Sequence, residues 1–428
     1  MGEAVAQLAD APRIPPTGAE RCYAAIAPVI FTAVHLAARL RGATPAELRQ
    51  RRGFLPAAGP APLWLHGASA GEMAAAHGLV ALLRAGGHAV AAAYTTTNAA
   101  GRQWIESRLA PGDVAALAPW DAPRWVARAC DAWRPRALIL IETELWPALI
   151  GAANARQVPV ISASARFYPG DAARYRRAGV WMRPTFQRLS AVLAQDAAQA
   201  AEFVALGVPA ARCVVAGNLK HAASSDTPPR AAARARFGAA REDRLVAFGS
   251  LHADEVPLIA PGVDRLAAAG ARCLVAPRHR DGVAALERLA AARGWRLVRR
   301  SSAHPAADWS VLLLDRVGEL RAAYAAADLA VVGGSFTPHG GHDLVEAVRA
   351  GVPVLFGPHT EHVAASAAAL AAATPKARLP DAAGLVDALV GWMADPSACA
   401  ALLERQRAAL PDAAAIASLY RAALAPLL

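Results

Sequence analysis

The chain has 428 residues, of which 55% are hydrophobic and 18% charged, and its formal net charge is +11. This length exceeds one ordinary hydrophobic core and indicates two domains, while the composition excludes a disordered chain. The cations are almost all arginine, and no Arg-rich run is interleaved with aromatic residues. We therefore expect no nucleic-acid partner, because an acidic substrate or an anionic lipid surface accounts equally well for the charge.

The N-terminal part of the chain contains one apolar segment. Residues 22–38 are all uncharged, and a polar tail at 1–21 precedes them. The segment is at the lower length limit for a membrane-spanning helix and contains Pro28, so spanning and lying on the surface both stay open. We predict an apolar membrane-anchor helix at 22–39. The arginines that follow it predict that the rest of the chain lies on the cytoplasmic side.

From residue 62 onward, short apolar runs alternate with segments of helical length, which is the βαβ pattern of a parallel sheet. Residues 221–243 interrupt the pattern with Ser, Asp and a Pro-Pro pair, after which it restarts. The sequence predicts an α/β protein with two doubly wound domains and a central cleft, one at 40–217 and one at 218–428, whose final helices could pack back. The predicted strands are 62–66, 88–94, 136–142, 158–164 and 190–195, then 244–250, 272–278, 309–315, 328–335 and 352–358.

Polar residues and glycines follow these strands, where ligands bind in such sheets. In 333–358, two Gly-Gly pairs bracket a short loop before a predicted helix near His342, which favours phosphate binding over a plain tight turn. Glu346, four residues after His342, would share its helical face and could bind ribose hydroxyls. Arg278 and His279 are predicted either to bind a phosphate or to lie in a solvated loop. Residues 250–255 allow the same two interpretations, and Asp254 and Glu255 could equally be ordinary charges at a helix N-terminus.

Glu142 and Glu144 follow a strand of aliphatic residues, so we expect at least one carboxylate to face the cleft, the alternative being that Glu144 caps a helix. Lys220 is one of only two lysines, which suggests a site that needs a compact ammonium group. The chain has no GxGxxG after the first predicted strand of either domain and no GxxxxGK[ST]. His339 and His342 have no partner cysteines or HExxH motif, so we expect neither a metal nor a cofactor.

The motifs WLHGASAGE, TTT, IETELWP, AR at 165–166, GNLK, SLHADE, PRH, GEL and GGSFTPHGGHDLVEA occur in this order. In this order the chain resembles the 3-deoxy-D-manno-octulosonic acid (Kdo) transferases of lipopolysaccharide synthesis, over residues 20 to 375. The resemblance implies a GT-B fold and inverting transfer of Kdo from CMP-Kdo to a lipid A precursor. It also implies the inner membrane as partner, with the enzyme at its cytoplasmic face.

The resemblance also implies roles for individual residues. Glu72 would be the general base, kept ionised by the nearby helix N-terminus, and Glu142 and Lys220 would be further catalytic residues. The acceptor would contact Ser69, Gly71, Thr95, Thr96, Thr97 and Arg166. The donor would contact Ser250, His252, Arg278, His279, Gly333, Gly334, Ser335, Gly340, Gly341, His342, Asp343 and Glu346.

Several positions depart from the family pattern. Asp343 and Ser164 each replace an expected asparagine, Gly282 replaces an expected arginine, and the threonine motif has an extra residue before Gly101. These departures put the finer donor contacts in question and leave room for a different acid sugar, and two further alternatives also stay open. The chain could transfer another nucleotide-activated acid sugar, it could act on another sugar nucleotide as an epimerase or transferase, or it could be an inactive membrane-associated binding protein.

Overall fold

The computed structural model describes residues 12, 14–222, 227–302 and 308–428, so most of the predicted tail lies outside the described residues. The chain divides into two compact units. Unit 1 comprises Met1–Ala223 and Asp412–Leu428, and unit 2 comprises Ser224–Pro411. The sequence placed the domain boundary after residue 217, which would put Lys220 in the second domain. Unit 1 extends to Ala223, so Lys220 belongs to unit 1.

Unit 1 contains a seven-stranded parallel sheet with the order β3-β2-β1-β4-β5-β6-β7. Its strands are β1 (Leu63–Gly67), β2 (Ala92–Thr96), β3 (Val114–Leu117), β4 (Ala137–Ile141), β5 (Val160–Ala165), β6 (Ala191–Ala194) and β7 (Cys213–Val215). Its helices are α2 (Gly18–Leu40), α3 (Pro45–Arg51), α4 (Ala70–Ala85), α5 (Ala99–Glu106), α6 (Pro123–Trp133), α7 (Pro147–Ala155), α8 (Asp171–Gln187), α9 (Ala197–Ala205) and α18 (Ala413–Leu424), with 3-10 turns η2 (Ala210–Arg212), η3 (Leu219–His221) and η6 (Ala425–Leu427).

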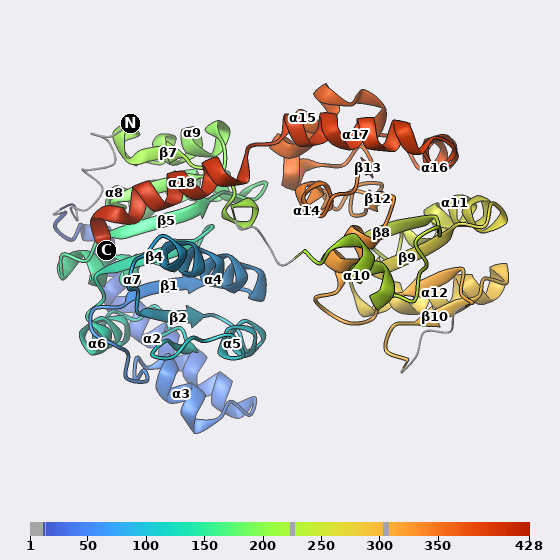
Figure 1. Cartoon of the computed structure of the whole chain (residues 1–428). Helices are drawn as coiled ribbons and strands as arrows, with labels where there is room; N and C mark the ends of the chain where they lie inside the picture. The colour runs from blue at the N-terminus through green and yellow to red at the C-terminus, as the bar shows by residue number, and fades with distance from the viewer. Residues whose placement is uncertain (1–11, 13, 223–226, 303–307) are drawn as a thin grey trace. The chain divides into compact units, whose positions relative to one another are not determined.

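Helices cover both faces of this sheet (Figure 1). Because successive side chains of a strand point to opposite faces, Leu63 and Leu65 of β1 pack with α4 and α18, while Trp64 packs with α6 and α7. The strand order reverses beside β1, which pairs with both β2 and β4. The carboxyl ends of β1 and β4 therefore form the topological switch point, where open α/β sheets bind ligands.

Unit 2 contains a six-stranded parallel sheet with the order β10-β11-β9-β8-β12-β13. Its strands are β8 (Leu245–Leu251), β9 (Arg272–Pro277), β10 (Leu297–Arg299), β11 (Val311–Leu313), β12 (Leu329–Val332) and β13 (Val354–Phe356). Its helices are α10 (Arg230–Arg236), α11 (Val256–Ala268), α12 (Arg280–Arg293), α13 (Leu320–Ala326), α14 (Leu344–Arg349), α15 (Ala364–Ala373), α16 (Ala383–Ala394) and α17 (Pro396–Ala409), with 3-10 turns η4 (Glu361–Val363) and η5 (Pro375–Ala377). The order reverses beside β8, which pairs with β9 and β12.

The apolar N-terminal segment forms α2, which a capping box at Thr17 begins. Among the described residues, α2 is the one unbroken helix long and apolar enough to cross a membrane. One side of it packs on the rest of unit 1, where the Tyr23 hydroxyl donates to Asp121 at 2.7 Å and Ala27 is buried. The other side is exposed and apolar, with Val29 72% accessible. The helix therefore presents a free hydrophobic surface whether it spans a bilayer or lies on it.

The last helix, α18, is part of the core of unit 1. The buried Tyr420 hydroxyl donates to the Gly217 carbonyl at 2.9 Å and accepts from the Ser164 N–H at 2.9 Å. A Cβ on Gly217 would lie 2.9 Å from Ile416, so only glycine lets α18 approach this closely. The backbone of Ser164, one of the departures from the family pattern, thus joins β5 to α18.

Candidate active site

Glu72 lies in the first turn of α4, directly after β1. Its carboxylate turns back toward the strand, where it accepts the Ala68 N–H at 2.5 Å and the Ser69 hydroxyl at 3.1 Å. Ser69 caps α4 by accepting the Glu72 N–H at 3.3 Å. A Cβ on Gly67 would lie 2.9 Å from the Glu72 Cβ, so the small residues before Glu72 make room for this conformation.

Two of the three predicted acceptor threonines support the loop that carries Glu72, and the third packs against β1. Thr96 and Thr97 donate their hydroxyls to the Ala68 carbonyl at 3.1 and 3.0 Å. Thr95 is buried and accepts from the Trp64 indole at 2.8 Å. For Thr95 and Thr96 this differs from the prediction that they contact the acceptor, because both are fully buried. Thr97 is half-buried, and its acceptor contact stays a prediction.

Glu142 follows β4 with a backbone φ of +59°, a conformation that is strained for a residue with a side chain. Its carboxylate is nearly inaccessible and is held between the Lys220 ammonium at 2.6 Å and the Tyr168 hydroxyl at 3.2 Å. Lys220 also lies beside the start of α4, since a Cβ on Gly71 would be 4.0 Å from its Nζ. Lys220 therefore neutralises the buried Glu142 close to the Glu72 helix.

Glu144 does not cap α7, because its carboxylate accepts the Trp146 indole at 2.8 Å and lies 3.4 Å from His66 Nε2. Asp121 provides the cap from a distant loop by accepting the Ala148 and Leu149 N–H groups at 3.0 and 2.8 Å. Glu144 is therefore free to line the pocket that Glu72 and Glu142 also line.

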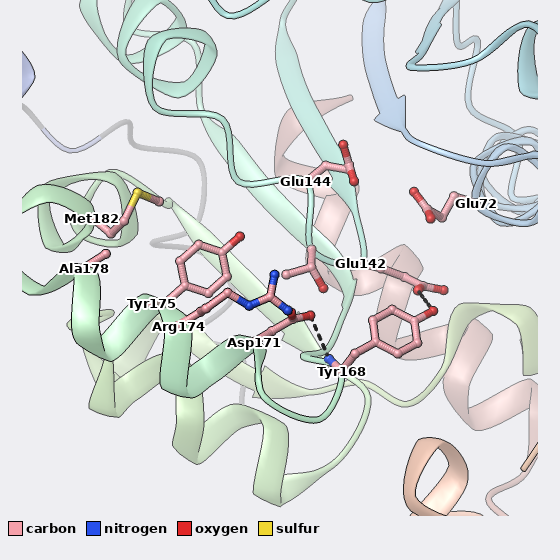
Figure 2. A pocket seen from close by; sticks show the side chains of 10 residues that line it. Glu72, Glu142, Glu144, Tyr168, Asp171, Arg174, Tyr175, Ala178 and Met182 are labelled. Atoms are coloured by element: carbon pink, nitrogen blue, oxygen red, sulfur yellow. Dashed lines mark hydrogen bonds and ion pairs between the residues drawn. The ribbon is translucent and has the colours of Figure 1, made fainter. Parts of the chain in front are cut away.

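This pocket has a volume of about 520 Å³ (Figure 2). In Figure 2, Glu72 lies across from the Glu142–Glu144 loop, and α8 forms another wall. The lining residues are Glu72, Glu142, Thr143, Glu144, Tyr168, Asp171, Arg174, Tyr175, Ala178 and Met182.

The pKa values of Glu72 and Glu144 move apart. Burial raises the pKa of Glu72 above its ordinary value of 4.5, and the charges of Glu142 and Glu144 add to this effect. Burial also acts to raise the pKa of Glu144, but hydrogen bonds from His66 and Trp146 outweigh it and leave that pKa lowered. The sequence suggested that the helix N-terminus would keep Glu72 ionised. In the structure the pKa of Glu72 is raised instead, because burial outweighs the favourable contacts. Two carboxylates with diverging pKa values are typical of acid–base sites.

Arg166 is the remaining predicted acceptor residue, and it stacks over the Tyr168 ring at 4.1 Å from guanidinium carbon to ring centroid. Tyr168 in turn bonds Glu142, so the pair connects Arg166 to the acidic pocket. Sequence reasoning missed Tyr168 and Asp121, because a tyrosine two positions after the AR pair and a lone aspartate two positions before a proline carry no motif.

Replacing Lys220 with methionine should destabilise unit 1 by about 2 kcal/mol, because the buried Glu142 carboxylate loses its ammonium partner. The double variant Lys220→Met/Glu142→Gln should recover most of this loss. Urea unfolding measures both effects. Lys376, the other lysine of the chain, is exposed, so Lys376→Met should leave the midpoint unchanged. A Lys220→Met midpoint equal to that of Lys376→Met would contradict the prediction.

In unit 2, Glu255 organises the turn between β12 and α14. Its fully buried carboxylate accepts the N–H groups of Gly334 at 2.6 Å, Phe336 at 2.9 Å and His252 at 3.0 Å. A Cβ on Gly333 would lie 2.8 Å from the Glu255 carboxylate and from the β8 backbone. Glu255 is thus not an ordinary helix-end charge, and its burial was not visible in the sequence.

The turn also occupies the backbone groups for which we predicted phosphate contacts. The Gly333 N–H donates to the Gly249 carbonyl at 2.8 Å, and the Gly341 N–H donates to the Gly334 carbonyl at 2.7 Å. Ser335 is buried, and its hydroxyl bonds Val332 and Gly357. These groups are therefore hydrogen-bonded within the turn that they shape, and a phosphate contact at Gly333, Gly341 or Ser335 stays a prediction.

Histidine side chains cluster beside this turn. His252 and His342 have their Nε2 atoms 3.0 Å apart, and the His252 ring stacks on His339 with a centroid distance of 3.7 Å. Burial, the charge of Arg278 and the neighbouring histidines lower the pKa of His342 from 6.5 to about 4. Because one neutral imidazole can donate to another, the short contact joins two uncharged rings at neutral pH. His279 contacts His252 edge-on, with ring centroids 5.5 Å apart.

The other predicted donor residues are distributed around α14, which begins at Leu344 and not near His342. Asp343 is its N-cap and accepts the Val345 N–H at 2.9 Å, so this departure from the family pattern has a structural use. His342 precedes the helix and does not share a helical face with Glu346, which lies 3.6 Å from Arg321. Gly340 has a positive φ and packs against the His362 ring, and Ser250 also has a positive φ.

Solved structures with the same fold include UDP-GlcNAc 2-epimerase from Neisseria meningitidis, with a TM-score of 0.58 and 12% identity over 85% of this chain and 99% of that one. A glycosyltransferase from Rickettsia africae has a TM-score of 0.58 and 9% identity, again over 85% of this chain and 99% of that one. With two doubly wound parallel sheets in the chain, these neighbours confirm the predicted GT-B fold class.

Residues 46–223 match the protein family described as 3-Deoxy-D-manno-octulosonic-acid transferase (kdotransferase). The 3-deoxy-D-manno-octulosonic acid transferase of Bordetella pertussis is 33% identical over 402 residues, which cover 90% of this chain and 92% of the relative. The transferase of the same name from Haemophilus influenzae is 28% identical over 73% of this chain and 75% of its own length. The chain therefore belongs to the Kdo transferase family and is a glycosyltransferase of lipopolysaccharide synthesis.

Proposed function

We propose that the chain transfers Kdo from CMP-Kdo to a lipid A precursor with inversion and releases CMP. The observation that carries this proposal is the pocket of unit 1, where a buried base with a raised pKa lies near a carboxylate with a lowered one. The sequence relatives support the identity of the transferred sugar. CMP-Kdo as donor and a lipid A precursor as acceptor are inferred from the resemblance of the sequence motifs.

Unit 1 would bind the acceptor in the pocket of Figure 2. Glu72 takes the proton of the attacking hydroxyl while that oxygen forms a bond to the anomeric carbon of Kdo. The bond from that carbon to the phosphate oxygen breaks, and CMP leaves with the electron pair. Lys220 holds the Glu142 carboxylate in place, and the nearby charges of Glu142 and Glu144 help to raise the pKa of Glu72.

Unit 2 would bind the donor at the carboxyl ends of β8, β9 and β12. Arg278 and His279, both exposed, are positioned to receive the phosphate of CMP, with His252 and His342 as neutral hydrogen-bonding partners. Glu346 lies at the start of α14 and could bind the ribose hydroxyls. The glycines at 333, 334, 340 and 341 have no side chains, so the donor could approach the backbone of this turn closely.

The membrane part of the proposal places the enzyme at the cytoplasmic face of the inner membrane. The exposed apolar side of α2 supports contact with a bilayer. Arginines 39, 41, 49, 51 and 52 follow directly and favour the cytoplasmic side.

The test is a single-turnover reaction of the full chain with CMP-Kdo and a tetra-acylated lipid A precursor, read by mass spectrometry. We expect product heavier than the acceptor by the mass of one or more Kdo residues. Parallel reactions with CMP-sialic acid and with UDP-N-acetylglucosamine distinguish the donor. Transfer from either of these, and none from CMP-Kdo, would refute the proposed donor.

A further inference from the structure

Helix α8 has two faces with different chemistry. One face lines the pocket of unit 1 through residues three or four positions apart, as Figure 2 shows for Asp171, Arg174, Tyr175, Ala178 and Met182. The other face consists of exposed side chains. The helix is therefore a thin wall between the pocket and the surroundings of unit 1.

The outward face carries two large apolar residues. Val180 is 74% accessible and Trp181 is 52% accessible, and they follow a kink at Gly179, whose φ is +41°. Among the tryptophans that the structure describes, Trp181 is the exposed one. Adjacent exposed Val and Trp beside a substrate pocket are more than the scattered apolar residues of an ordinary surface.

Arginines surround this apolar pair. Arg176, Arg177 and Arg183 are all exposed on the same helix, and Glu202 of α9 pairs with Arg176. An amphipathic helix with Trp and Arg side chains matches the interface of a bilayer, where the ring enters the headgroup region and the guanidinium groups meet anionic phosphates.

The same helix is joined to the apolar helix α2. Arg188, at the end of α8, forms an ion pair with Glu20 in the first turn of α2 and also donates to the Ile14 carbonyl at 3.0 Å. The ends of the two helices are thus held together within unit 1. The Val180–Trp181 surface thus lies on a helix joined at its end to α2, which itself presents Val29 and its neighbours to the outside.

We propose that the outward face of α8 contacts the surface of an anionic lipid bilayer. This contact would bring the rim of the acidic pocket to the headgroups, so that the sugar of a lipid-borne acceptor enters the pocket while its acyl chains stay in the bilayer. The inference rests on the proposed lipid acceptor and adds where the enzyme meets it.

Quenching of tryptophan fluorescence tests the contact directly. The full chain is mixed with phosphatidylethanolamine–phosphatidylglycerol vesicles whose acyl chains carry bromine, and wild type is compared with Trp181→Phe. Because α2 brings both proteins to the vesicles, the difference between them reports Trp181 alone. We expect wild type to lose more signal than the variant, and the difference to shrink at high salt. Equal losses would overturn the proposal.

Kinetics provide the second test. Val180→Asp should raise the apparent KM about tenfold for an acceptor embedded in anionic vesicles, and should leave transfer to a detergent-dispersed acceptor unchanged. Val390→Asp, at an exposed valine on α16 of unit 2, is the matched control and should match wild type. A Val180→Asp KM on vesicles equal to that of the control would overturn the proposal. If wild type transfers nothing, the proposed function fails, and the quenching result still decides the lipid contact.

Discussion

Glu72→Gln should lower the single-turnover rate of transfer by about 10²- to 10⁴-fold at pH 7, because the amide cannot take the proton of the attacking hydroxyl. The amide oxygen can still accept the Ala68 N–H, so the loop should keep its conformation. Rapid quench with mass detection measures the rate. Glu106→Gln, at an exposed glutamate on α5, is the control and should match wild type.

The raised pKa of Glu72 adds two expectations. The base must be ionised, so the rate should rise with pH through a pKa above 4.5, and Glu144 cannot produce this limb because its own pKa is lowered. The folded state also holds the proton of Glu72 more tightly than the unfolded chain, so this contribution to stability is lost as pH rises through that window. Glu72→Gln should therefore melt no lower than wild type at pH 7. Wild-type turnover by Glu72→Gln would disprove its role as base.

Glu255→Ala should destabilise unit 2 by about 3 to 5 kcal/mol and abolish CMP binding. Three N–H groups, those of His252, Gly334 and Phe336, lose their acceptor, and each unsatisfied buried group costs about 1 to 3 kcal/mol. Urea unfolding gives the stability change. Thermal shift with CMP gives the loss of binding, because a bound ligand raises the melting temperature.

The neighbouring acid provides a matched control. Asp254 is exposed, and its carboxylate lies 3.1 Å from His339, so Asp254→Ala should cost less than about 1 kcal/mol. Glu255→Gln should fall between the two, because one side-chain oxygen remains as an acceptor. Equal unfolding midpoints for Asp254→Ala and Glu255→Ala would show that the carboxylate of Glu255 does not hold the turn.

The sequence pattern predicted the central strands and missed β3, β7 and β10. Each of these strands is at the edge of its sheet, and each is short and partly exposed. A central strand of a parallel sheet is buried on both faces and has a continuous apolar run, as in β4. An edge strand such as Leu297–Arg299 is only partly buried, so it lacks a continuous apolar run and its sequence resembles that of a loop.

The site was predictable where residue type alone sets the chemistry. Glu142 and Lys220 stood out because a carboxylate after a buried strand and a rare lysine are unusual in this sequence, and the structure pairs them. The roles of Thr95 and Glu255 were not predictable, because they depend on which side-chain or backbone donors from distant parts of the chain lie within 3 Å. Thr95 bonds Trp64 across 31 positions of the chain, and Glu255 bonds Gly334 across 79.

The packing of α18 also bears on the order in which the protein is synthesised. Unit 2 is inserted between Ala223 and Asp412, so the ribosome makes all of it before the α18 residues that complete the core of unit 1. Until then the hydrophobic groove that receives Ile416 and Tyr420 is open to water. Unit 2 can fold early as the nascent chain emerges, whereas unit 1 must wait until α18 has emerged, with exposed apolar surface that chaperones bind.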